Sequence, residues 1–416
     1  MSHHAPTIKV EVGFQTTPAF GAPFQLDNDP YGRLDTGGGL GGVQFVDVTP
    51  KVMSIGITRG RNRNTEAFNA GTASVAFKDP ERELDPLNTA SIYYPYVLPR
   101  QPIRIFANEI QIYAGVITDW NLDYGYTVDA DVITATCSDA FTFLANMTLA
   151  AFTPSLENTG ERINTVLNRS EIEYQGPYDI DFGQSELGAF AVPQGTNVLN
   201  YLQNITASEA GWLFVNARGV LTFLDRQTTI NPVPTIEFAD DGAGVKYQTL
   251  TNQFGDELLY NSVQMQSPAG SVQTASDSMS IGLYQAVQYS KLDLLNSSTE
   301  EVQELANAFL RLHKDPQLRF TGVTIQLWAL SDAHQAQVLS AELADTVDVE
   351  RTFSTGTPST VSQRVVVAGI SHQITPASHV VTFAFEKIRQ QAYLTLADSP
   401  SSTNPLSRLD LNALAF

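Results

Sequence analysis

The sequence predicts a mainly β fold with an α+β insert, built around two similar β-barrel domains. Short runs of Val, Ile, Thr, Phe and Tyr alternate with polar residues, and Gly, Pro, Asn and Asp bound these runs. Two hairpin-like segments also share an Ala-Gly pair inside an apolar strand that leads to a second strand: 112–118 with 132–136, and 366–371 with 380–385. Glycine inside a strand often marks a bulge or a barrel corner. One barrel early and one late in the chain explains this faint repeat, and chance similarity of two hairpins is the alternative.

The first 45 residues are expected to form an arm or loop region. Residues 18–42 contain five glycines between positions 37 and 42. A phosphate-binding loop needs a following helix and usually a Lys-Ser/Thr pair. Residues 43–48 instead have the pattern of a strand, and no lysine precedes Lys51 in this stretch. We therefore predict a flexible loop.

The remaining chain divides into two barrel domains, an insert and a tail. We expect the first barrel at residues 46–150, the α+β insert at 151–245, the second barrel at 246–392 and a C-terminal tail at 393–416. The insert is predicted from a helix followed by a hairpin at 212–215 and 220–224. Other predicted strands are 7–14, 73–77, 103–107, 110–117, 132–136, 323–328, 365–370 and 380–385. The tail ends in spaced apolar residues and is expected to dock on a neighbour.

Three segments have the spacing of amphipathic helices: 161–168, 197–209 and 299–314. Asn158 with Glu161, and Ser298 with Glu301, have the spacing of a capping box. The second helix is expected to end before Gly211 and the third before Asp315-Pro316. Each apolar stripe predicts packing against a core.

The composition restricts the class of protein. The chain has 416 residues, of which only 16% are charged, and its formal net charge is −20. Average proteins have roughly 25% charged residues, so partners are expected to cover much of the surface. The negative charge argues against a dedicated binder of nucleic acid or of anionic membranes. With one cysteine, Cys137, no intrachain disulfide can form. We find neither a signal peptide nor a membrane-spanning run, and expect a soluble protein made in a reducing cytoplasm.

No catalytic, metal or cofactor site is predicted. The sequence contains no HExxH, GxSxG or SxxK motif. His372 and His379 flank the turn of the last hairpin, and a metal bound between them is a weak alternative. Asp79, Glu81, Glu83 and Asp85 alternate as in a calcium loop, but the sixth and twelfth positions hold Leu84 and Ala90 in place of Gly and Glu. We expect a loop there.

One local cluster is basic: Arg59, Arg61 and Arg63. Guanidinium groups can hold phosphates or the carboxylates of a partner. In a chain with a net charge of −20, contact with another protein is the interpretation that we favour. A solvated loop and a DNA contact are the alternatives.

Several runs, in consistent order, resemble one family. They are ITRGR at 57–61, AGTASVAF at 70–77, DP at 79–80, LDPLN at 84–88, PIRI at 102–105 and YAGVI at 113–117. Together they are similar to the N-terminal domain of minor tail proteins of long-tailed phages, which resemble the baseplate hub of contractile-tailed phages. The hairpin at 211–226, the lead into the second barrel at 301–316 and the run VAGISH at 367–372 also fit.

The resemblance implies a structural, non-enzymatic hub at the phage tail tip. Such hubs are homotrimers, and two barrels per chain give a ring with pseudo-sixfold symmetry. The ring joins the sixfold tail tube, through the distal tail protein, to the threefold tip. It closes around the tape measure protein, contacts other tip or receptor-binding proteins and lets DNA pass without specific binding. An acidic lumen would repel DNA phosphates. The alternatives are a tip-associated cell-wall hydrolase or carbohydrate-binding protein, and the sixfold distal tail protein itself.

Overall fold

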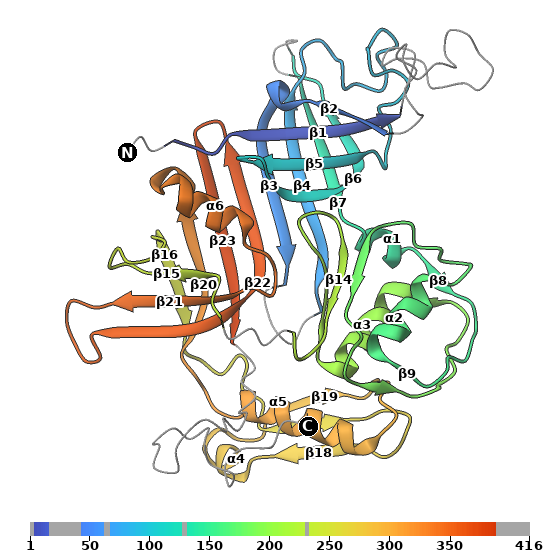
Figure 1. Cartoon of the computed structure of the whole chain (residues 1–416), viewed down its shortest axis with the longest axis vertical. Helices are drawn as coiled ribbons and strands as arrows, with labels where there is room; N and C mark the ends of the chain where they lie inside the picture. The colour runs from blue at the N-terminus through green and yellow to red at the C-terminus, as the bar shows by residue number, and fades with distance from the viewer. Residues whose placement is uncertain (1–3, 16–42, 62–66, 127–130, 229–232, 388–416) are drawn as a thin grey trace.

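A computed structural model describes residues 4–15, 43–61, 67–126, 131–228 and 233–387 (Figure 1). The predicted loop at 18–42, the predicted tail at 393–416 and Arg63 lie outside these residues. The fold is mainly β, as the sequence predicts. Its central feature is one 13-stranded sheet to which both the early and the late part of the chain contribute.

Seven strands of this sheet come from the early part of the chain. They are β1 (Ile8–Gln15), β2 (Val43–Asp47), β3 (Val52–Gly60), β4 (Asn69–Lys78), β5 (Pro102–Ala107), β6 (Ile110–Asp123) and β7 (Val132–Ser138). Six come from the late part: β15 (Ile236–Phe238), β16 (Thr249–Gln253), β20 (Arg319–Gln326), β21 (Thr346–Thr352), β22 (Thr360–Thr375) and β23 (Ser378–Lys387). Alternate residues of β4 and β23 are buried, as expected for strands with one face on the core.

The two parts repeat one strand order. The early strands pair in the order β3-β4-β7-β6-β5, and the late strands pair in the order β16-β20-β23-β22-β21. Details of the backbone repeat as well. The Ile117 N–H donates to the carbonyl of Gln101 (2.8 Å), and the Val367 N–H donates to that of Asp345 (2.9 Å). The residues directly before the two acceptors, Arg100 and Ala344, both have positive φ, at 67° and 74°. We call the two sets of five strands the early unit and the late unit.

The Ala-Gly pairs that suggested the repeat do not occupy matching positions. The register shift between β6 and β7 falls at Thr118, and that between β22 and β23 falls at Ala368. Residue 118 therefore corresponds to 368, and Ala114-Gly115 lies four residues away from the position that matches Ala368-Gly369. The glycine at 369 does lie beside a bulge, as glycines in strands often do.

The two units are joined into one sheet, and the described strands do not close into barrels. Residues 369–374 of β22 pair with residues 60–55 of β3 in antiparallel register. The sheet then runs from β16 at one end to β2 at the other, and no pairing among the described residues joins these ends. The expectation of two closed barrels is therefore not confirmed for the single chain. The reason is the length of β22: its first half pairs with β21 and its second half, along the same edge, pairs with β3.

An α+β insert follows the early unit along the chain (Figure 1, green). Helices α2 (Thr159–Leu167) and α3 (Val198–Glu209) pack on each other, and β10 (Tyr178–Ile180), β14 (Leu221–Leu224) and β13 (Trp212–Val215) form a three-stranded sheet. The predicted capping box of Asn158 and Glu161 is present. Short elements complete it: α1 (Phe141–Ala145), β8 (Thr148–Leu149), β9 (Glu157–Asn158), β11 (Glu186–Leu187) and β12 (Thr196–Asn197).

A second α+β unit is inserted between β16 and β20. It contains β17 (Ser262–Met265), β18 (Gln273–Ser276), β19 (Gln288–Lys291), α4 (Ser278–Tyr284) and α5 (Thr299–His313). Its own small core includes Val263, Val302 and Ala306. The predicted helix at 299–314 is thus confirmed as α5. It begins after the Ser298 cap as expected and packs on this small sheet. Helix α6 (Asp332–Ser340) and two short 3-10 helices, Thr49–Lys51 and Leu327–Ala329, complete the described elements.

Candidate assembly interface

Several strand edges of the large sheet, including the outer edges of β2 and β15, have no strand partner within the described residues, and two others bear on assembly. The first is the outer edge of β16, which pairs with β20 along its other edge. The second belongs to the C-terminal half of β6. Val116 pairs with Pro102 of β5 on one side and with Ser138 of β7 on the other, and beyond it only the β7 side continues to be paired, as far as Asp123. We call these the β16 edge (Thr249–Gln253) and the β6 edge (residues 118–123).

Neither edge contains the Lys or Pro residues that often protect exposed strands, although β6 has a bulge at Thr118. Open edges present unpaired N–H and C=O groups, and proteins usually block them with Lys, Pro or bulges that turn the edge away. The sequence of β16, TLTNQ, contains neither Lys nor Pro, and four of its five residues are exposed. The β6 edge likewise contains neither Lys nor Pro. These edges can accept another strand.

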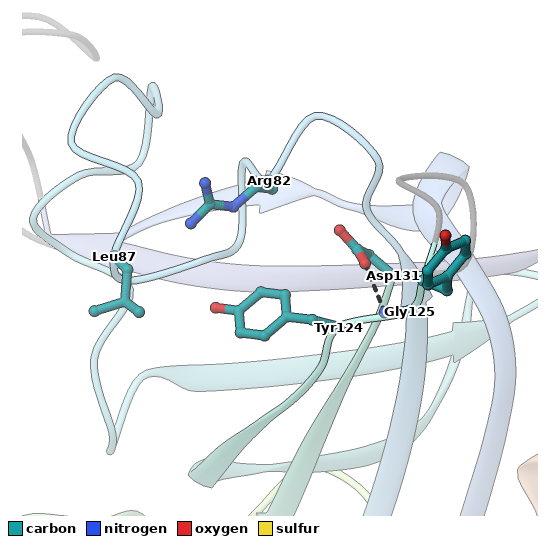
Figure 2. A pocket seen from close by; sticks show the side chains of 6 residues that line it. Arg82, Leu87, Tyr124, Gly125 and Asp131 are labelled. Atoms are coloured by element: carbon teal, nitrogen blue, oxygen red, sulfur yellow. Dashed lines mark hydrogen bonds between the residues drawn. The ribbon is translucent and has the colours of Figure 1, made fainter.

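The β6 edge leads into an open depression with exposed aromatic rings (Figure 2). The depression has a volume of about 430 Å³ and is lined by Arg82, Leu87, Tyr124, Gly125, Tyr126 and Asp131. The Gly125 N–H donates to Asp131 Oδ1 at 2.8 Å, which fixes the chain where it leaves β6. Tyr126 is fully exposed, and Leu87 is 70% exposed. Exposed Tyr side chains are typical of protein interfaces.

The carboxylates of the loop after β4 are used inside the loop. Asp79 is buried, accepts the N–H of Leu84 (2.7 Å) and pairs with Lys51 (2.8 Å). Asp85 is also buried and pairs with Arg82 (2.6 Å). No group of three or more His, Cys, Asp or Glu side chains suited to a metal ion occurs in the described part of the chain. Residues 79–101 contain neither helix nor strand, in agreement with the predicted loop in this stretch.

Two arginines of the basic cluster, Arg59 and Arg61, pair with carboxylates from the late part of the chain. Arg59 is buried, and its Nη1 lies 2.6 Å from Glu342 Oε1. Arg61 is buried too and makes a two-pronged contact with Glu386, at 2.7 and 2.8 Å. These residues connect β3 with elements that follow it by about three hundred positions in the chain. The predicted contact of Arg59, Arg61 and Arg63 with another protein stays a prediction.

The insert also contributes to this junction. The Arg61 guanidinium lies over the rings of Phe68 (4.4 Å) and Trp212 (4.9 Å). Glu342 accepts the backbone N–H of Ala217, in the turn between β13 and β14, at 2.7 Å. Cation–π contacts and charge-assisted hydrogen bonds are strongest where water is excluded. The early unit, the late unit and the insert are therefore held together at one place.

Two buried histidines lie on the late-unit side of this junction. His372 Nδ1 is 3.1 Å from His379 Nε2. Burial lowers the pKa of His379 from 6.5 to about 4, and burial together with the neighbouring His379 lowers the pKa of His372 well below its usual range. Both rings are therefore neutral at pH 7. Burial also raises the pKa of the Cys137 thiol to about 12, so this thiol is protonated and unreactive.

Comparison with known proteins places the fold among phage tail proteins. No protein-family model and no curated protein matches the sequence. Among solved structures, the 43 kDa tail protein of prophage MuSo2 from Shewanella oneidensis matches with a TM-score of 0.59 and 11% identity, covering 92% of this chain and 98% of that one. A tail protein from Neisseria meningitidis MC58 gives a TM-score of 0.56 and 10% identity, covering 92% and 97%. Prophage tail protein gp18 from Listeria monocytogenes EGD-e gives 0.50 and 11%, covering 91% and 95%.

These matches confirm the resemblance to phage tail proteins at the level of the fold. They extend over nearly the full length of both partners, so the insert and both units are included. The described helices contain none that is long and apolar enough to span a membrane. The free edges of β16 and β6 were not predicted from the sequence, because an edge is defined only by which strands pair across the whole sheet.

Proposed function

We propose that this chain is a structural hub of a phage tail tip, assembled as a homotrimer with pseudo-sixfold symmetry. In this role it joins the sixfold tail tube and distal tail protein to the threefold tip. It closes around the end of the tape measure protein and opens for DNA during ejection. It is synthesised in the host cytoplasm and resides in the virion, with other tip or receptor-binding proteins as further neighbours.

The observation that carries this proposal is the repeated strand order. One chain contains β3-β4-β7-β6-β5 and β16-β20-β23-β22-β21, with matching bulges and matching hydrogen bonds. Three such chains contain six similar units, which is the number needed to face a sixfold tube on one side while keeping threefold symmetry on the other. The fold shared with phage tail proteins supports the same role.

The predicted domains take distinct parts in the proposal. Residues 46–150 and 246–392 supply the units of the ring, and residues 151–245 supply the insert that braces them. The arm at 1–45, apart from β1 and the part of β2 that belong to the sheet, and the tail at 393–416 contact neighbouring tail proteins. The proposal assigns the chain no enzymatic activity and no cofactor. Asp79 and Asp85 of the loop after β4 have a structural part in it, since they pair with Lys51 and Arg82.

Solution mass and location in the particle test the proposal together. The chain mass is 45.4 kDa, and light scattering of the purified full chain should give three times this value. Gold-labelled antibodies against the chain should mark one end of isolated tails. A mass six times that of the chain would favour the distal tail protein, and clearing of cell walls in a zymogram by the purified chain would favour the hydrolase.

A further inference from the structure

Helix α4 exposes three large apolar side chains of the second α+β unit. Met279, Leu283 and Tyr284 are 77%, 68% and 42% exposed. Met279 and Leu283 are four positions apart, so they lie on one face of the helix. The helix contains no charged residue. Neighbouring exposed apolar side chains, unlike scattered single ones, mark an interaction site. We call these three side chains the α4 patch.

The other side of α4 is fixed to the end of α5. Ser280 is 1% exposed, and its hydroxyl donates to the carbonyl oxygen of Lys314, the residue that follows α5. Asp277 caps α4 by accepting the Ser280 N–H at 2.9 Å, and it pairs with the Lys314 ammonium at 2.8 Å. These contacts hold the helix in place and leave the α4 patch facing outward.

The described part of the chain ends close to α4. Strand β23 ends at Lys387, whose ammonium donates to the side chain of Gln317. Gln317 follows Lys314, which holds α4, by three residues, and three residues span at most about 10 Å. The sequence beyond Lys387 therefore starts within reach of the α4 patch, and 29 further residues follow.

The end of this sequence has the chemistry that suits an apolar surface. Residues 406–416, LSRLDLNALAF, contain four leucines and a phenylalanine. The apolar residues at 406, 409, 413 and 416 have the spacing of one face of an amphipathic helix. The two charges of the segment, Arg408 and Asp410, cancel, although the whole chain has a net charge of −20. Such a segment can pack on the uncharged α4 patch without bringing further negative charge to it.

We propose that residues 406–416 of this chain bind the α4 patch of the same chain. The contact removes apolar surface of both the segment and the helix from water. This inference does not depend on the ring of the proposed function. It narrows one part of that proposal, because it assigns the end of the tail to its own chain and leaves residues 393–405 for neighbouring tail proteins.

The short connection favours the chain's own tail over that of a second copy. Eighteen residues, 388–405, separate Lys387 from Leu406. Eighteen residues span at most about 60 Å, and as a random coil they have a root-mean-square span of about 23 Å. A tether of this length gives an effective concentration in the millimolar range. A contact too weak to join separate molecules at micromolar concentration is therefore populated within one chain.

Cysteine cross-linking in the full-length chain tests the contact. Met279→Cys with Leu414→Cys, treated with a short bismaleimide, should give a link that mass spectrometry detects after digestion. The native Cys137 is buried and the pKa of its thiol is about 12, so it stays unreacted. Leu87→Cys with Leu414→Cys is the matched control, because Leu87 is 70% exposed but belongs to the loop after β4.

The expected result is a link within one chain. Its yield with Met279→Cys should exceed that with Leu87→Cys by at least about tenfold, which corresponds to about 1.4 kcal/mol. Mixtures of isotope-labelled and unlabelled chains separate links within a chain from links between chains. Equal yields for the two pairs would overturn the contact, and links mainly between chains would overturn the choice of the same chain. A trimeric mass beside either of these results would leave the proposed function standing.

Substitutions in the tail test whether the contact is apolar. Leu406→Asp with Leu409→Asp, added to the reactive cysteine pair, should reduce the yield to that of the control pair. Ser401→Asp with Ser402→Asp adds the same charge to the connecting residues and should leave the yield unchanged. Equal losses in the two variants would show that the added charge, and not the lost apolar surface, prevents the link. That result would overturn the proposal.

Discussion

At the residue scale, the charges that matter most are buried. Arg61 and Glu386 are 7% and 9% exposed and lie 325 positions apart in the chain. Removing one partner of a buried ion pair is costly because the other charge stays buried without compensation. This ion pair therefore holds the early and late units in one arrangement. Each of its two charges is compensated only while the other is present.

Replacing Arg61 by Leu should lower the free energy of unfolding by about 3–5 kcal/mol, because Glu386 loses its partner. Urea denaturation measures this loss. The double variant Arg61→Leu with Glu386→Leu should recover part of it, since no charge then stays buried alone. The matched surface pair is Arg364 with Asp348, where the arginine side chain is 42% exposed. Arg364→Leu should cost at most about 1 kcal/mol. Equal losses in Arg61→Leu and Arg364→Leu would contradict the structural role of the buried pair.

The histidine pair predicts a pH dependence of stability. The pKa of His379 is about 4 in the folded chain and about 6.5 when unfolded. Between these values the unfolded state binds a proton that the folded state does not, so stability falls as the pH drops from 6.5 to 4. His379→Gln should reduce that slope by up to about 1.4 kcal/mol per pH unit. Urea denaturation at several pH values gives the slope, and an unchanged slope would show that His379 does not contribute.

The sequence patterns predicted the basic cluster but not the carboxylates that pair with it. The basic cluster is visible as RGR at 59–61, whereas Glu342 and Glu386 follow hundreds of positions later. No local rule connects such residues, because the pairing of β3 with β22 brings them together. In the same way, His372 and His379 were recognised as neighbours across a turn, but their burial could not be read from the hairpin alone.

At the element scale, the joint between the units depends on a glycine. Gly60 has φ of +98°, and a Cβ added there would lie 2.2 Å from the Ala368 carbonyl oxygen and 2.6 Å from Gly369 Cα. These atoms belong to the backbone of β22 and cannot move aside without opening the junction. Strand pairing between the units therefore requires a residue without a side chain at this position.

Gly60→Ala should destabilise the chain more than a matched substitution in open space. Gly242 has nearly the same φ, +97°, and nothing within 4 Å of the added Cβ. Gly242→Ala is expected to cost only backbone strain, about 1–3 kcal/mol. Gly60→Ala should cost the same strain and, in addition, about 1–3 kcal/mol for overpacking. Thermal and urea unfolding of the two variants give the comparison. Equal losses would show that the close approach of β3 and β22 is dispensable.

Local signals predicted helices well where caps and stripes coincide. The predicted segments 161–168, 197–209 and 299–314 correspond to α2, α3 and α5 with ends within two residues. α6 was missed because its turns bury only Gln335, Val338 and Leu339, which is too few apolar positions for a clear stripe. The repeat was recognised from Ala-Gly pairs that are four residues out of register, so the hairpins were right and the matching residues were wrong.

At the scale of the whole molecule, the net charge of −20 bears on DNA. A ring through which DNA passes must not hold it, and carboxylates repel phosphates. We predict that the assembled chain does not bind duplex DNA near physiological salt, where charges are screened beyond about 8 Å. Fluorescence anisotropy of a labelled duplex measures this. Salt-sensitive binding would contradict an acidic passage and point to a basic lumen.

No local sequence pattern predicts that one sheet runs continuously through both units. The fold class and the insert follow from periodicity, turns and caps. The union of two units into one sheet follows from a pairing between residues 55–60 and 369–374, far apart in sequence. Contacts of that kind depend on the relative placement of whole units, as do the free edges that remain.

A density map of the assembled ring, by electron cryo-microscopy of the purified chain or of tails, tests the central claim most directly. We predict three chains around the axis and six copies of the five-strand unit, with one β3–β22 joint inside each chain. A ring of six chains, or three chains whose early and late units sit in unrelated positions, would contradict it.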